Sequence, residues 1–161
     1  MKKAIVMCFY FSLVCLSLAE ESSSKRMAFL NIQNDLSVQQ VTISKLKTWL
    51  ENAGYTTTID KDGDLEYKDK SGKGSSFVML DKKRSFVNFR SYWRRGDMSV
   101  EELRKRANKI NNEFIFIKIS VEEKGASLAY DLIYTGGLNR TNFIDSFKWF
   151  LDMNDLFEHY E

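Results

Sequence analysis

Short β-type segments joined by tight turns constrain the fold of this chain more than any other feature of its sequence. Asp62-Gly63 is a hairpin signal, since both central positions of a type I′ turn need positive φ. Strands joined by connections this short must run antiparallel, because a parallel pair needs a crossover of a dozen or more residues. Six strands are predicted, at residues 55–60, 64–70, 76–80, 85–94, 114–121 and 127–134.

Three helical segments separate and flank these strands, at about 41–52, 99–112 and 139–158. Gly54 ends the first, a Ser99–Glu102 capping box begins the second, and Asn139 or Thr141 caps the third. The order α-β-β-β-β-α-β-β-α predicts an α+β fold, a twisted antiparallel sheet with three helices. In the second helix the buried positions should be Leu103, Ala107 and Ile110, and the solvated ones Arg104, Lys105, Arg106 and Lys109.

Alternation within the strands predicts a sheet with one buried side and one partly covered side. In segment 85–94 the buried side should carry Val87, Phe89, Ser91 and Trp93, and the other side Phe86, Asn88, Arg90 and Tyr92. In segment 114–121 one side should carry Ile115, Ile117, Ile119 and Val121.

The first nineteen residues have the form of a secretory signal. Lys2 and Lys3 form its charged start, residues 4–18 its apolar stretch, and Ser17-Leu18-Ala19 its small-residue cleavage site. We expect a signal peptide at 1–19, a flexible polar leader at 20–36 and a single α+β domain at 37–161. The protein would then be exported, to the periplasm or beyond the cell, with no stable membrane span after cleavage.

Two alternatives at the N-terminus stay open. Lipidation at Cys15 would make the chain a lipoprotein, although Val14 fits the preceding position poorly. Retention as an anchor would want about 20 apolar residues, and the stretch 4–18 is shorter.

Removal of the signal leaves little chemistry for catalysis or metal binding. Cys8 and Cys15 both leave with it, and His159 is the one histidine of the chain. The usual nucleophile–base pairs and zinc ligand sets therefore have almost nothing to be built from, and we expect no cofactor and no metal. The acids at Asp60, Asp62 and Asp64 resemble a calcium loop, but Gly63 stands at the wrong position for an EF-hand.

Composition indicates a folded domain without a general attraction to polyanions. The chain is 43% hydrophobic, which is enough to fill a core. Two of the 24 Lys and Arg residues leave with the signal, so 22 remain against 22 Asp and Glu. Basic and aromatic residues alternate over 82–95, a pattern that can bind single-stranded nucleic acid, but a neutral exported domain argues against that partner.

The final helix is apolar around most of its circumference. Phe143, Phe147, Phe150 and other residues gather on one side, and further apolar residues widen that arc to roughly 240°, where about 100° suffices for a surface helix. Either the helix is enclosed between layers, or it presents part of this surface to a partner. The candidate interface residues are Trp149, Met153, Leu156 and Tyr160.

Three stretches together resemble the YbjN family of bacterial proteins, often labelled sensory transduction regulators. They are residues 46–55 (LKTWLENAGY) leading into the D-G-D-L hairpin, residues 108–112 (NKINN) before a β run, and Gly136-Gly137-Leu138 before a Phe-rich helix. The resemblance covers about residues 41–158. It implies a fold similar to type III secretion chaperones, frequent pairing as homodimers, and a non-enzymatic role in binding or regulating other proteins. The signal is a departure, because many relatives lack an export address.

These observations predict an exported, non-catalytic module that binds protein or peptide, chaperone-like or regulatory, as a homodimer. One alternative is a small exported hydrolase that uses paired carboxylates, which would need two acids in one cleft with their pKa values pushed apart. The acids of this chain instead fall at turns and helix ends. A structural envelope protein is the other alternative.

Overall fold

A computed structural model describes residues 35–68 and 75–159. The chain divides after Asp35 into two compact units, and the second, from Leu36 onward, contains the six-stranded sheet and the helices described here. The predicted signal at 1–19 and the predicted turn at 71–74 lie outside the described residues, as does nearly all of the predicted leader. No helix within residues 35–68 and 75–159 is long and apolar enough to cross a bilayer.

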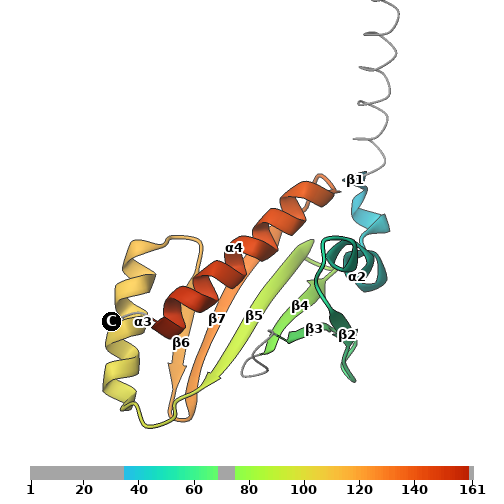
Figure 1. The fold of residues 1–161 in the computed structure, drawn as a ribbon. Helices are drawn as coiled ribbons and strands as arrows, with labels where there is room; N and C mark the ends of the chain where they lie inside the picture. The colour runs from blue at the N-terminus through green and yellow to red at the C-terminus, as the bar shows by residue number, and fades with distance from the viewer. Residues whose placement is uncertain (1–34, 69–74, 160–161) are drawn as a thin grey trace, which may run out of the picture. The chain divides into compact units, whose positions relative to one another are not determined.

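The elements follow the predicted order, with three short additions (Figure 1). Strands β2 to β7 form one antiparallel sheet in the order β2-β3-β4-β5-β7-β6, and β1 and β8 form a two-stranded one. The elements are β1 (Asp35–Leu36), the 3-10 helix η1 (Val38–Gln40), α2 (Ile43–Asn52), β2 (Thr57–Ile59), β3 (Leu65–Lys68), β4 (Ser75–Asp81), β5 (Phe86–Arg94), α3 (Val100–Glu113), β6 (Lys118–Glu122), β7 (Gly125–Ile133), β8 (Leu138–Asn139) and α4 (Arg140–His159).

The three helices begin at side-chain caps. Thr42 accepts a hydrogen bond from the Lys45 amide at the start of α2, and the Ser99–Glu102 capping box predicted for α3 is present. Of the two caps considered for α4, the structure has Asn139, whose Oδ1 accepts from the amide of Asn142 at 3.1 Å. Each side chain satisfies a backbone donor that the first helical turn leaves unpaired.

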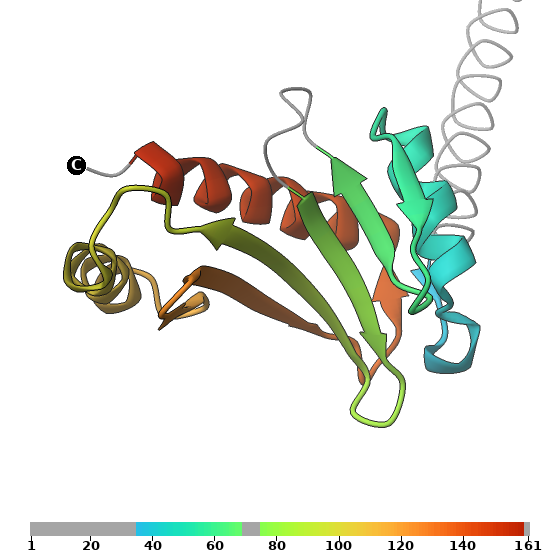
Figure 2. The ribbon, with the colours of Figure 1, turned by 90° about the horizontal axis from the view of Figure 1, so that it is seen from below.

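Helix α4 lies across one face of the sheet, with α2 at the β2 side and α3 at the β6 side (Figures 1 and 2). Phe89 of β5 is central to this packing. Its ring lies 5.7–5.8 Å from the rings of Tyr130, Phe143, Phe147 and Phe150. Val87, Phe89 and Ser91 are buried and Trp93 is half-buried, as the alternation predicted. The buried Ser91 hydroxyl is paired with that of Ser76 at 2.7 Å.

The first hairpin differs from the predicted type I′ turn. Gly63 has φ +87°, but Asp62 has no positive φ. The Gly63 amide donates to the carbonyl of Asp60, and the Asp60 amide donates to the carbonyl of Asp64. This is a three-residue loop, a type I turn followed by a left-handed glycine. The Asp60 carboxylate accepts the amides of Asp62 and Asp64, so it holds the turn itself.

The strand predicted at 114–121 begins later than expected, and the prediction for Ile115 is wrong. Helix α3 continues to Glu113, with Phe114 as its C-cap, so the next residues form a turn and β6 starts at Lys118. Ile115 and Phe116 are 90% and 75% exposed in that turn. Ile117 and Ile119, which were predicted to share one side, are both buried.

Candidate functional site

No helix of the described domain covers the sheet face opposite α4 (Figure 2). The alternation predicted for β5 holds here too, because Phe86, Asn88 and Arg90 are half-buried and Tyr92 is 51% exposed. Register fixes which neighbours share this side. We call it the uncovered sheet face and define it by Phe77 and Met79 of β4, Phe86, Asn88, Arg90 and Tyr92 of β5, Ser127, Ala129, Asp131 and Ile133 of β7, and Lys118 and Ser120 of β6.

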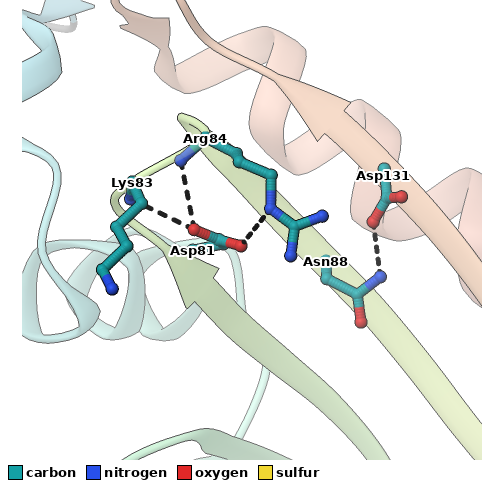
Figure 3. A network of polar contacts seen from close by, with 5 residues as sticks. All are labelled: Asp81, Lys83, Arg84, Asn88 and Asp131. Atoms are coloured by element: carbon teal, nitrogen blue, oxygen red, sulfur yellow. Dashed lines mark hydrogen bonds and ion pairs between the residues drawn. The ribbon is translucent and has the colours of Figure 1, made fainter.

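One end of this face is ordered by polar contacts near the β4–β5 turn (Figure 3). Asp81 Oδ1 accepts from the amides of Lys83 and Arg84 at 3.1 Å each, and its Oδ2 pairs with Arg84 Nε at 2.9 Å. Between the strands, Asn88 Nδ2 donates to Asp131 Oδ1 at 2.5 Å. The Asp81 carboxylate therefore stabilises the turn, and the Asp131 carboxylate connects β7 to β5.

The middle of the face is more apolar and holds a cation. The rings of Phe77 and Tyr92 meet edge-on at 6.0 Å. Arg90 lies directly opposite Phe77 on one side and Ala129 on the other. Among the described residues, the Arg90 guanidinium has one polar partner: its Nη1 lies 3.5 Å from the Tyr92 hydroxyl.

Three of the four interface candidates on α4 can be placed. Trp149 is half-buried, and its ring meets that of Tyr130 edge-on at 5.2 Å. Met153 also packs against the core, and Leu156 is half-buried. Tyr160 lies outside the described residues. Trp149 and Met153 thus lie along the margin of α4 next to the sheet, while Phe143, Phe147, Phe150 and Phe157 point into the core.

The acids of the described residues lie mainly at turns and helix ends. No group of three or more His, Asp or Glu side chains there could hold a metal ion. The pKa of Asp64 is raised by burial and by the charges of Asp60 and Asp62, all within one turn. The pKa of Tyr134 is raised by burial and by Asp81. His159, in the last turn of α4, contacts Asp155 of the same helix.

Two polar residues have roles that the helical pattern did not predict. Arg106, expected in the solvated stripe of α3, is half-buried, and its Nη1 donates to the carbonyls of Phe157 and Glu158 at the end of α4. Asn111 hydrogen-bonds both backbone groups of Ile119 on the edge strand β6, at 2.8 and 2.9 Å. A one-dimensional pattern carries no signal for such contacts, because each joins two elements.

Three solved structures share this fold. The E. coli YbjN crystal structure, described as "a putative transcription regulator", matches 76% of this chain and 90% of its own at 13% identity, with a TM-score of 0.64. A chain of the ExsC–ExsE complex matches 73% and 94% at 14% identity, with a TM-score of 0.57. A chain of the HopA1–SchA chaperone–effector complex matches 67% and 85% at 10% identity, with a TM-score of 0.50.

The fold predicted from sequence, α+β and similar to secretion chaperones, is therefore confirmed. No curated protein sequence matches this chain. The sequence profile of one family, "YbjN: Putative bacterial sensory transduction regulator", matches residues 42–160, which include α2, the whole six-stranded sheet and α4. The chain belongs to the YbjN family.

Proposed function

We propose that this chain is an exported, non-catalytic module that binds protein or peptide in a chaperone-like or regulatory role. The observation that carries the proposal is the uncovered sheet face. Five large apolar side chains lie on it, and Tyr92 and Ile133 are 51% and 61% exposed. Large apolar side chains gathered on one exposed face are typical of sites of interaction with other molecules. The five are Phe77, Met79, Phe86, Tyr92 and Ile133.

Family membership and fold support this reading. YbjN proteins carry a regulatory description, and two of the similar structures are complexes, one of them named for a chaperone and its effector. Because a fold by itself does not fix function, this support is an analogy. The physical argument comes from the uncovered sheet face. Its carboxylates near the β4–β5 turn already hydrogen-bond neighbouring residues, so its apolar side chains are the groups that a partner would contact.

The experiment is capture of partners from envelope extract by the purified protein, compared with a variant of the face. Tyr92→Ser with Ile133→Ser removes exposed apolar area without touching the core. Ile115→Ser with Phe116→Ser is the matched control, because it removes a similar exposed area from the turn before β6. The face variant should lose captured proteins that the control retains. Equal capture by the two variants would contradict the proposal.

A second part of the proposal is that α4 forms a homodimer contact through Trp149, Met153, Leu156 and Tyr160. Trp149→Glu with Leu156→Glu places charges on this margin, and charges are depleted in interface cores. A folded monomer by circular dichroism and light scattering would support the contact. An unfolded variant would instead assign these residues to the monomer core, and an unchanged oligomeric state would remove the contact. Lys148→Glu, on the exposed side of α4, is the control.

Export is the third part, and its motivation is the sequence of residues 1–19. Protein recovered from its native host should begin at or near Glu20 and carry no lipid. Intact-mass measurement distinguishes this from retention of Cys15 with a lipid adduct and from an uncleaved N-terminus.

A further inference from the structure

We propose that the uncovered sheet face recognises a carboxylate carried by an apolar protein segment, and that Arg90 and Lys118 bind this carboxylate above Ala129. The inference rests on the proposed function, because it presupposes that a protein segment docks on this face. It adds the chemistry of the segment and the residues that select it.

One row of residues on this face crosses five strands of the sheet. Register places five residues directly opposite one another on successive strands, so their side chains point to the same side. They are Glu66 of β3, Phe77 of β4, Arg90 of β5, Ala129 of β7 and Lys118 of β6.

Ala129 makes a gap between two cations in this row. Arg90 and Lys118 are two strands apart, so their Cα atoms are separated by about 10 Å, twice the strand spacing. The residue between them has only a methyl group, and both flanking side chains are long. On the next row the small residues Ser127 and Ser120 lie opposite each other, so the space above Ala129 continues there. A carboxylate above Ala129 lies within reach of both cations.

Arg90 flanks this gap and has donors to spare. A guanidinium has five N–H donors, and within the described residues Arg90 makes the single 3.5 Å contact with Tyr92. Its Nε is buried without a partner. The ion pairs among residues 35–68 and 75–159 include neither Arg90 nor Lys118. A carboxylate that accepted from the remaining Nη donors would form a charge-assisted hydrogen bond, which is stronger than a neutral one.

Two acids near these cations favour a single carboxylate over a polyanion. Asp131 follows Ala129 on the same side of β7, and Glu122 ends β6 beyond Ser120. Both are exposed. A nucleic acid backbone that followed the two cations would meet these acids, whereas one carboxylate flanked by apolar residues would not. The neighbouring rings of Phe77 and Tyr92 suit those apolar flanks and lower the local dielectric, which strengthens the ion pair.

The experiment uses a phage library of random 12-residue peptides, selected on the purified protein and on three variants. Arg90→Met and Lys118→Met keep most of each side chain's length and remove its charge. Lys105→Met, an exposed cation on α3, is the matched control. Circular dichroism confirms that each variant is folded. A selected peptide is then synthesised with its acid intact and with Asp→Asn or Glu→Gln, and its Kd is measured by fluorescence anisotropy.

Peptides selected on the wild-type protein should combine apolar residues with one acid. Amidation of that acid should weaken binding about tenfold, which is the scale of one charge-assisted hydrogen-bonded pair. Arg90→Met and Lys118→Met should reduce this preference for acid over amide, and Lys105→Met should leave it intact. Peptides that bind without an acid, or whose preference survives Arg90→Met, would overturn the inference and leave the proposed function standing.

Two further outcomes complete the test. If the wild-type protein enriches no peptide at all, both the proposed function and this inference fail. If a single-stranded oligonucleotide competes with the selected peptides, and Arg90→Met abolishes its binding, the two cations serve a polyanion and the inference is overturned.

Discussion

The two faces of the central sheet are built from the same strands and have opposite character. On β5, Phe89 is fully buried and contacts four aromatic rings, whereas Tyr92, three residues later, is 51% exposed. On the covered face the buried hydroxyls of Ser76 and Ser91 hydrogen-bond each other, while Thr57 Oγ1 is buried without a partner among the described residues. On the uncovered face Arg90 uses one of its donors, in the long contact with Tyr92. The comparison teaches that the alternation of side chains along single strands separates the packed core from the face for which we propose a role in recognition.

The largest expected difference between the faces is in core packing. Phe89→Ala should destabilise the fold by about 3–5 kcal/mol, because it leaves a cavity among four rings that cannot all collapse into it. Tyr92→Ala should cost less than about 1 kcal/mol, because half of its surface is already in water. Urea denaturation of the two variants measures the contrast. Similar losses would mean that the uncovered face also serves as core.

The sheet edge is a third kind of surface, and it depends on one side chain. Asn111→Ala should cost about 1–3 kcal/mol, because it leaves the amide and carbonyl of Ile119 without partners. It should also promote self-association, since unpaired edge groups are a template for another strand. Asn112→Ala, on the exposed side of α3, is the control. Denaturation and light scattering measure both effects, and a variant as stable as that control would contradict this role.

Polar pairs on the two faces sharpen the comparison further. Ser91→Ala should cost about 1 kcal/mol, because the buried Ser76 hydroxyl loses its partner. Asn88→Ala should cost less than about 0.5 kcal/mol, because Asp131 is exposed and water replaces the lost donor. The double variant Ser76→Ala with Ser91→Ala should recover part of the first loss. An equal cost for Ser91→Ala and Asn88→Ala would show that both pairs are equally shielded from water.

The smallest effect concerns pH, and two acids should respond with opposite sign. Burial, with Asp60 and Asp62, raises the pKa of Asp64, so its ionised form destabilises the fold and falling pH relieves that cost. Asp64→Asn should therefore gain less than about 0.5 kcal/mol at neutral pH, and the gain should vanish in acid. Thermal melts across pH 3–7 measure it. A gain that persists in acid would point to a cause other than charge.

Glu102 provides the matched opposite. The Ser99 hydroxyl and amide hydrogen-bond its carboxylate and lower its pKa, with a further contribution from Arg106. The stability it supplies is complete above its unfolded pKa and is lost as pH falls through the lowered folded value. Glu102→Gln should lower the melting temperature at neutral pH, and the difference from wild type should shrink in acid.

Much of the covered face could be predicted from sequence because it follows local rules. The alternation of Val87, Phe89 and Ser91 and the caps at Ser99 and Asn139 need only neighbouring residues to be recognised. β1 and β8 were missed, since two residues carry no periodicity. The prediction placed Ile115 in the strand because the apolar run starts directly after α3, whereas a turn separates α3 from β6, which starts at Lys118.

The candidate site was predicted less completely. The sequence indicated which residues of β5 share the uncovered face, but not that Ala129 would lie between Arg90 and Lys118. That row depends on strand order, in which β7 lies between β5 and β6, so β5 pairs with β7 rather than with β6, the next strand in sequence. Alternation along one strand carries no information about which strand lies beside it.

The contact between Arg106 and the end of α4 has a consequence for the order of folding. Its two hydrogen bonds, each 3.2 Å long, join residues more than 50 positions apart in sequence. They occupy carbonyls of the last helical turn, which α4 cannot satisfy from within. That turn is therefore complete only after α3 has docked, and it should be among the first places to open when α3 moves. Hydrogen exchange of the amides near Phe157 would then report on movements of α3 away from α4.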